Sequence, residues 1–184
     1  RIPEECVPAF EEMGGVWSES MGHGNYGPIA VSPWAFEAWR TATGEDFFQL
    51  GTSTTYLKGM TRWAVNLTVP FSNETAWIDD NRAANLSGFA RVAPILGARY
   101  RDPVANAISD KSRRENWHPI PWHRFLFYDP TVRSSSSRDA GYPLATHFEG
   151  AGHVYMRSTW SDPNATWAFF GAGPKFAGHS RDDE

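Results

Sequence analysis

Ionisable side chains gather near the end of the chain, directly after an apolar segment and a glycine-rich turn. Residues 178–183 read Gly-His-Ser-Arg-Asp-Asp, which places the imidazole of His179 close to a guanidinium and two carboxylates. Glycines permit unusual dihedral angles and a close approach of the backbone, so this turn suits a site that faces a polar ligand. The alternative is the solvated end of a hairpin that carries an Arg–Asp pair.

The same segment offers few ligands for a metal ion. His179 supplies one good imidazole ligand and the carboxylates could add others, but the guanidinium of Arg181 cannot bind a metal. The chain has a single cysteine, Cys6, which excludes an internal disulfide and a cysteine-based zinc site. We therefore predict no metal site from these residues alone.

A second group of polar residues lies in a glycine-rich loop over residues 14–27, between two expected helices. The loop holds four side chains that can bind a ligand or move a proton: Glu19, His23, Asn25 and Tyr26. The unperturbed pKa is about 6.5 for histidine and about 10 for tyrosine, so a site that tunes them can use both in proton transfer. The alternative is a helix connection in which Trp17 and Tyr26 are buried and Glu19 caps a neighbouring helix.

Two further groups combine aromatic and cationic residues. The segment 122–124 (Trp-His-Arg) could bind an acidic sugar, although packing between two domains also explains it. The strand expected over residues 153–160 alternates between two faces. Its face with His153, Tyr155 and Arg157 is predicted to meet solvent.

Composition narrows the class of protein. The 184 residues are 41% hydrophobic with a net charge of −4, so the chain is neither disordered nor a typical nucleic-acid-binding protein. Aromatic residues make up 15%, and their rings fill cores or stack on sugars. No apolar run approaches the about 18 residues of a membrane span. The chain starts at Arg1 rather than at Met, and we expect a fragment of a longer polypeptide, with one domain or parts of two.

Helices are expected first and strands last, which predicts the α+β class. Ser32 is expected to cap a helix that has Pro33 at its first position and ends near Gly44. The other helices are predicted over residues 3–13, 46–64, 75–85, 88–101 and 103–114. An antiparallel hairpin is predicted from two strands and the turn between them, over residues 153–160, 165–170 and 161–164.

Four segments of the chain, in their order along the sequence, resemble those of a heparinase II/III-type polysaccharide lyase. The resemblance covers nearly the whole chain and is carried by residues 14–20 with Tyr26, 125–130, 152–160 and 178–184. It implies an incomplete (α/α) toroid over residues 1–118, followed by an antiparallel β-sheet or β-sandwich domain over residues 119–184. It also implies an active site where the two domains meet, with the rest of the polypeptide completing both.

The resemblance implies β-elimination in a polysaccharide that contains uronic acid, such as alginate or a glycosaminoglycan. Tyr26 and His179 match the catalytic tyrosine and histidine, and His23 is a further catalytic candidate because several relatives have a tyrosine there. The residues expected to bind substrate are Trp17, Glu19, Asn25, His123, Arg157 and Arg181. Since Arg181 replaces a metal-binding histidine of many relatives, no cofactor is assigned, and a structural zinc is expected only if the complete polypeptide supplies its ligands.

The expected partner is an acidic polysaccharide, with no nucleic acid and no membrane span, and the expected location is secreted or periplasmic. A local cleft would bind this polyanion despite the negative net charge, through Arg124, Arg157, Lys175 and Arg181. Two alternatives stay open. One is a uronyl C5-epimerase on the same scaffold, which removes the same proton without elimination. The other is a glycan-binding protein that kept the fold without the chemistry.

Overall fold

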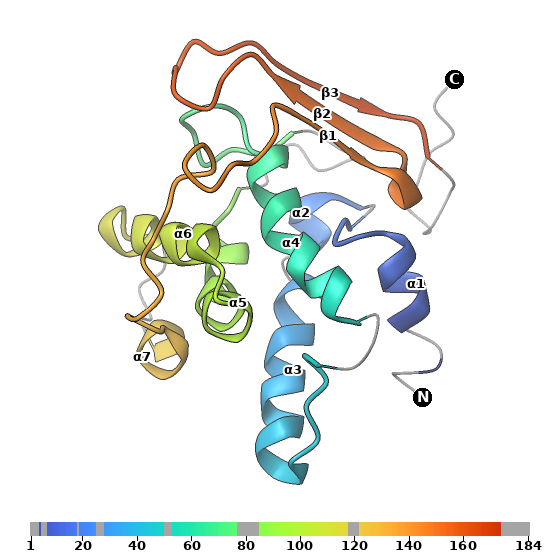
Figure 1. The fold of residues 1–184 in the computed structure, drawn as a ribbon, viewed down its shortest axis with the longest axis vertical. Coiled ribbons are helices and arrows are strands. Elements are labelled where there is room, and N and C mark those ends of the chain that lie inside the picture. Colours follow the sequence, from blue (N-terminus) through green and yellow to red (C-terminus); the bar gives the residue numbers. More distant parts are fainter. Residues whose placement is uncertain are drawn as a thin grey trace.

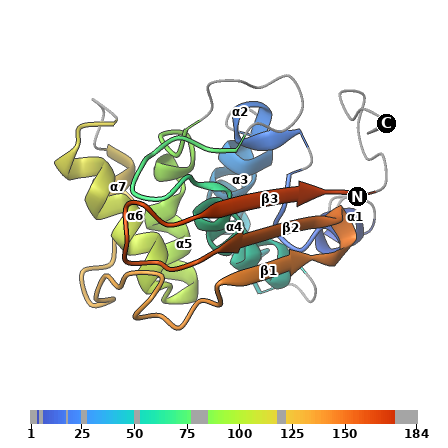
Figure 2. The same cartoon turned by 90° about the horizontal axis from the view of Figure 1, so that it is seen from above.

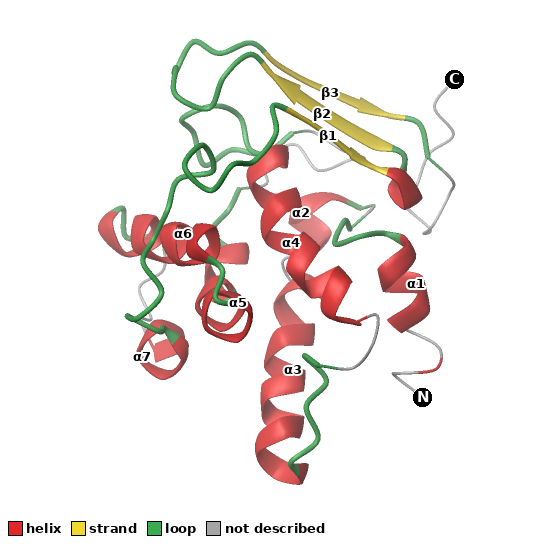
Figure 3. Cartoon of the chain, in the orientation of Figure 1, coloured by secondary structure: helices red, strands yellow, loops and turns green. Residues whose placement is uncertain are grey.

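The structure, a computed structural model, describes residues 4, 7–17, 19–24, 28–49, 53–76, 85–117 and 122–173. It has two layers, a group of helices and an antiparallel sheet that lies across one side of them (Figure 1). Figure 3 separates the layers by colour, with helices in red and strands in yellow. This arrangement confirms a mixed α+β architecture, while the toroid and the sandwich stay predictions. No helix in the described ranges is long and apolar enough to cross a membrane.

The helical layer extends from the first described residues to the loop that precedes the sheet. Its helices are α1 (Val7–Glu12), α2 (Ser20–Gly24), α3 (Pro28–Thr43), α4 (Ser53–Leu67), the 3-10 turn η2 (Phe89–Arg91), α5 (Ala93–Tyr100), α6 (Pro103–Arg114) and α7 (Trp122–Phe127). α6 confirms its prediction, because Asp102 caps it by accepting hydrogen bonds from the amides of Val104 and Ala105 at 2.9 and 3.1 Å. Pro103 at the start and basic residues in the last turn also favour the helix.

α4 is the central helix of the core. Fully buried apolar side chains recur along it at intervals of three and four residues, as in an amphipathic helix: Leu57, Met60, Trp63, Ala64 and Leu67. α4 contacts α1, α5 and β2, and residues of the sheet belong to the same hydrophobic core as the helices. Burying each large apolar side chain contributes about 1.5–3 kcal/mol before the cost of ordering the chain is counted.

Two predicted helix starts are wrong. α3 begins at Pro28 instead of being capped at Ser32, and Pro33 lies inside the helix. Pro28 suits a first helical position as well as Pro33 does, because the missing amide hydrogen is not needed there. α4 begins at Ser53 rather than at residue 46. The carboxylate of Asp46 accepts a hydrogen bond from the amide two residues later, at 3.0 Å, and so holds a turn.

The helix predicted over residues 75–85 is wrong at both of its ends. Thr75 pairs with Thr68, and Asn85 pairs with Glu74, in isolated antiparallel β-bridges. Threonine is β-branched and favours extended backbone, which agrees with the first bridge. Residues 77–84 lie outside the described part of the chain.

The sheet is formed late in the chain by three antiparallel strands. Their order is β1 (Ala145–Phe148), β2 (His153–Arg157) and β3 (Trp167–Gly171), with the 3-10 turn η3 (Glu149–Ala151) between β1 and β2. The pairing of β2 with β3 confirms the predicted hairpin. In the register of the sheet, Tyr155 on the middle strand stands opposite Thr146 of β1 and Phe169 of β3.

The face of β2 that was predicted to meet solvent is the buried one. Tyr155 is 0% exposed and His153 is 7% exposed, whereas Met156 on the opposite face is 44% exposed. The Tyr155 hydroxyl accepts a hydrogen bond from Trp63 of α4 at 3.1 Å. A tyrosine can be buried without penalty when its polar atom finds such a partner, so the polar face of this strand turns inward.

α7 and the sheet both follow the predicted domain boundary at residue 119. α7 is helical and packs against α5, and the sheet starts at Ala145. Seen from above, α2 lies beyond the β3 edge of the sheet (Figure 2). The boundary itself stays a prediction, because the helices and the sheet share one core.

Candidate functional site

The glycine-rich loop that starts at Gly14, called the N-terminal loop from here on, is anchored on α4 by contact between the two main chains. Gly15, with φ +97°, packs against Gly59 of α4. A Cβ atom on Gly15 would collide with the main chain of Gly59, and one on Gly59 would collide with the carbonyl of Gly14. Only glycine tolerates both the positive φ and this close approach. The Gly14–Gly15 pair therefore fixes the position at which the chain, on leaving α1, crosses α4.

Beyond this anchor the loop is packed against the core. Val16 and Met21 are fully buried, and α2 occupies part of the stretch that was predicted to be loop. Ser20 begins α2 with φ +73°, a left-handed conformation that is uncommon for a residue with a Cβ atom. Trp17 and Glu19, both predicted to bind substrate, are half-buried on this stretch. Their backbone is thus held by neighbours on either side.

Buried polar atoms beside this loop find no hydrogen-bond partner among the described residues. They are Glu11 Oε1, Trp17 Nε1, Ser20 Oγ and Tyr56 Oη. The rings of Trp17 and Tyr56 both contact Phe10, with centroid distances of 6.3 and 4.8 Å, and burial raises the pKa of Tyr56. Leaving a buried polar group unpaired costs about 1–3 kcal/mol, so native proteins keep few of them. A ligand rich in hydroxyl groups is one kind of partner that such atoms could take.

The C-terminal end of β3 lies near the place where Gly14 and Gly15 anchor the N-terminal loop. Gly173 packs against the carbonyl of Ala151 in η3, and Gly150 in η3 packs against the carbonyl of Glu12 at the end of α1. Figure 1 shows the end of β3 above α1, with η3 between them. Gly14 follows α1 by two residues. The chain that leaves β3 therefore starts close to the start of the N-terminal loop.

Several predicted residues lie outside the described part of the chain. These are Asn25, Tyr26, His179 and Arg181, together with the side chain of His23. The predicted meeting of Tyr26 with His179 therefore stays a prediction, and the described residues give only the points from which their segments start.

Arg157 joins the sheet to the end of α4. Its Nη2 atom donates to the carbonyl oxygens of Val65, Asn66 and Thr68 at 3.1, 3.1 and 3.2 Å, and its guanidinium stacks on Trp160 at 3.8 Å from the ring centroid. Carbonyls at a helix C-terminus attract cations. Burial lowers the pKa of Arg157 to about 10, so the group stays charged at neutral pH. Its contact with substrate stays a prediction, because Nη2 is already engaged with α4.

His123 lies in an aromatic cluster between α7 and α3. Its buried ring has centroid distances of 4.8 Å to Trp34 and 3.8 Å to Trp122. The adjacent Arg124 forms an ion pair with Asp110 of α6 at 2.7 Å. His123 and Arg124 thus pack against helices α3 and α6, whereas packing between two domains and sugar binding by His123 both stay predictions.

A buried network beneath the sheet escaped the sequence analysis. Trp63 Nε1 donates to Tyr155 Oη at 3.1 Å, and Tyr155 Oη lies 3.2 Å from His153 Nδ1. Phe148 and Phe169 flank the tyrosine ring, and burial raises the pKa of Tyr155, which keeps it a neutral phenol. Alternation along residues 153–157 signals two faces, but the contact with α4 decides which face is inside.

No known protein family, curated protein or solved structure matches this chain. Within the described ranges, no three His, Cys, Asp or Glu side chains cluster in a way that could hold a metal ion. The functional argument therefore depends on the residues of this chain and on their arrangement.

Proposed function

We propose that this chain forms part of the active site of a polysaccharide lyase that cleaves an acidic, uronic-acid-containing polysaccharide. The main support is that the segment leading to His179 and the loop leading to Tyr26 start close together. Gly173, η3 and the end of α1 form a continuous series of main-chain contacts that ends at this loop. Two segments that are distant in sequence and carry proton-transferring side chains thus begin at one end of the sheet.

The reaction requires two proton transfers. A base removes the C5 proton of the uronate, the electrons of that C–H bond form the C4=C5 double bond, and the C4–O bond breaks. An acid protonates the leaving oxygen. Tyrosine and histidine perform such transfers when the site brings their pKa values towards the working pH. We assign the transfers to Tyr26 and His179, with His23 as a substitute for Tyr26. A cationic or hydrogen-bonding group must stabilise the charge that builds on the uronate carboxylate.

Trp17 and Glu19 suit the part of the site that holds the sugar ring. An indole offers an apolar face for the C–H groups of a sugar and an N–H donor for a hydroxyl group. Trp17 Nε1 and Ser20 Oγ, which are buried without partners in the described part of the chain, are donors of this kind. The carboxylate of Glu19 can accept hydrogen bonds from sugar hydroxyls. These contacts would orient the sugar and leave proton transfer to other residues.

The test uses the whole polypeptide that contains these residues, incubated with alginate and with glycosaminoglycans. Ultraviolet absorbance of the C4=C5 double bond reports elimination. Tyr26→Phe and His179→Ala are each expected to lower the rate by about 10²–10⁴-fold, the usual contribution of an acid or base. Matched controls are Tyr128→Phe, on the loop after α7, and His147→Ala, on the exposed side of β1. Both controls should keep the wild-type rate.

The same assay separates the alternatives. Unchanged rates in Tyr26→Phe and in His179→Ala would remove the assigned site. Incorporation of deuterium at C5 from D₂O, with no gain in absorbance, would assign epimerisation instead. Binding of the polysaccharide without either product would identify a glycan-binding protein.

A further inference from the structure

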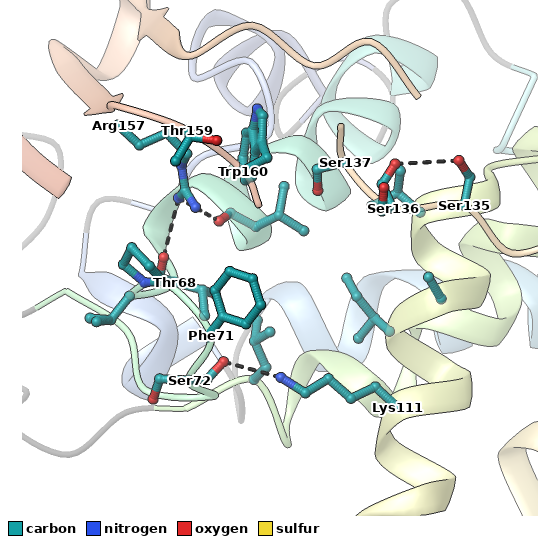
Figure 4. Close-up of a pocket in the computed structure, with 17 residues that line it drawn as sticks. Thr68, Phe71, Ser72, Lys111, Ser135, Ser136, Ser137, Arg157, Thr159 and Trp160 are labelled. Atoms are coloured by element: carbon teal, nitrogen blue, oxygen red, sulfur yellow. Dashed lines mark hydrogen bonds between the residues drawn. The ribbon is translucent and has the colours of Figure 1, made fainter. Parts of the chain in front are cut away.

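A hollow of about 250 Å³ opens near the C-terminal end of α4. It lies between the loop after α4, helix α6, the serine-rich loop at residues 135–137 and the end of β2. Its lining includes Thr68, Phe71, Lys111, Ser137, Arg157 and Trp160. Figure 4 shows Phe71 and Lys111 on one side of the hollow, with Trp160 and Ser137 on the other.

The charge of this hollow is positive although the whole chain has a net charge of −4. Lys111 and Arg157 line it, and none of its described lining residues is an aspartate or a glutamate. Lys111 Nζ donates to the carbonyl of Ser72 at 3.2 Å and lies 5.3 Å from the ring centroid of Trp117. An ammonium group has three donors, so Lys111 can hold these contacts and also bind an anion.

An exposed aromatic ring borders the hollow in a strained conformation. Phe71 is 63% exposed and has φ +54°, a value that few residues with a Cβ atom adopt. Such strain persists where the surroundings impose it, and it is concentrated at ligand-binding sites. Trp160, across the hollow, has one face covered by Arg157 at 3.8 Å, and its Nε1 donates to the carbonyl of Tyr142 at 3.0 Å. These contacts hold the indole in a fixed orientation.

We propose that this hollow binds one acidic sugar ring, with the C–H face of the sugar on Phe71 and its carboxylate or sulfate at Lys111. The hydroxyls of residues 135–137 border the hollow and can pair with those of the sugar. The hollow is smaller than the about 300–1,000 Å³ of pockets for drug-sized molecules, so it suits a single ring. A small aromatic carboxylate also combines an apolar ring face with one negative charge, so it could make the same contacts with Phe71 and Lys111. The choice of a sugar therefore rests on the proposed function.

The test measures binding without turnover, in the whole polypeptide carrying His179→Ala. Titration calorimetry follows an alginate tetrasaccharide, a chondroitin tetrasaccharide, neutral cellotetraose and benzoate. Lys111→Met should weaken binding of at least one acidic tetrasaccharide by about 10- to 100-fold, as expected for loss of a hydrogen bond to a charged group. Phe71→Ala should weaken it by about 2- to 10-fold.

Matched controls separate this site from general effects of charge and apolar surface. Lys58→Met removes an exposed ammonium from α4, and Phe125→Ala removes an exposed ring from α7. Neither should change binding, and circular dichroism should show that all variants are folded. Equal affinity in Lys111→Met and in the parent would overturn the proposal. Binding of benzoate that depends on Lys111, with none of either acidic sugar, would overturn the assignment to a sugar.

The proposed function can fail separately from this site. Lys111-dependent binding of an acidic sugar, in a protein that never forms an unsaturated product, supports the hollow and rejects the lyase. A protein that forms the product, yet binds the tetrasaccharides equally well with and without Lys111, supports the lyase and rejects the hollow.

Discussion

Replacing Tyr155 by phenylalanine tests whether the network beneath the sheet stabilises the contact between β2 and α4. The change removes one oxygen atom, which accepts a hydrogen bond from Trp63 Nε1 at 3.1 Å and lies 3.2 Å from His153 Nδ1. The aromatic ring keeps its place between Phe148 and Phe169, so the loss of the hydrogen bonds dominates over any new cavity.

The expected cost follows from the burial of the indole N–H. Tyr155 and Trp63 are both 0% exposed, so water cannot replace the missing acceptor. A buried donor without a partner costs about 1–3 kcal/mol. We expect the free energy of unfolding to fall by about 2 kcal/mol, which lowers the melting temperature by about 4–8 °C in a chain of this size.

Urea denaturation of wild type, Tyr155→Phe, Trp63→Phe and the double variant measures this coupling as a double-mutant cycle. Tyr128→Phe is the control, because its half-buried hydroxyl makes only a long hydrogen bond, at 3.4 Å to Asp110, and the change should alter stability by less than about 0.5 kcal/mol. A Tyr155→Phe variant as stable as this control, with no coupling to Trp63, would refute the reasoning.

Three other substitutions test contacts at the end of α4, at the anchor of the N-terminal loop and on α6. Arg157→Met should lower the free energy of unfolding by about 1.5–3 kcal/mol, because carbonyls at the end of α4 lose a charged donor. Urea denaturation measures this. Gly59→Ala gains about 1 kcal/mol of helix propensity, yet the collision with Gly14 should cost more, so thermal unfolding should show net destabilisation. Burial alone would raise the pKa of Asp110, but the hydrogen bond from Ser134 and the charge of Arg124 outweigh it and lower the pKa. The contribution of Asp110 to stability should therefore be present above pH 3.8 and be lost as the pH falls below 3.8 through the lower pKa of the folded carboxylate, since the unfolded carboxylate binds a proton first. Asp110→Asn should flatten this fall in denaturation curves recorded at each pH.

Local signals in the sequence were enough to predict some elements. α6 has an aspartate cap, a proline at its first position and basic residues at its end, and each acts within one turn of the helix. The β2–β3 hairpin has an alternating strand and a turn rich in Ser, Asp, Pro and Asn, which also act locally. Such elements need little tertiary information.

Other features could not be predicted, because two local sequence signals favoured different structures equally well. Pro28 and Pro33 can both start a helix, and the sequence does not rank them. Asp46 favours a helix start and a turn by the same hydrogen bond to a following amide. The inner face of β2 could not be chosen from polarity either. Tyr155 is stable inside because its hydroxyl finds partners there, His153 on the same strand and Trp63, which is 92 residues earlier.

The candidate site shows the same division. The sequence alone identifies the glycine pairs, the residues able to transfer protons and the segments that contain them. The contact of Gly15 with Gly59, and that of Gly150 with the end of α1, join parts of the chain that no local pattern relates. The Lys111 hollow was missed for the same reason, since its walls come from the loop after α4, from α6 and from β2.

The anchor of the N-terminal loop and the hollow both involve residues of α4, and this arrangement links the two proposals. Gly59 of α4 anchors the N-terminal loop, and Val65 of the same helix borders the hollow, roughly 9 Å further along at 1.5 Å per residue. Binding energy from a distant sugar promotes catalysis only when the same polysaccharide chain fills both places, since it then fixes the reacting sugar in position. Arg157 ties the end of α4 to β2, so loss of this contact disturbs the hollow and the sheet that leads to His179 together. Lys111 borders the hollow from α6 and is not part of the contact that Arg157 makes with α4, so its loss should weaken binding of the sugar and leave the contact between α4 and β2 in place.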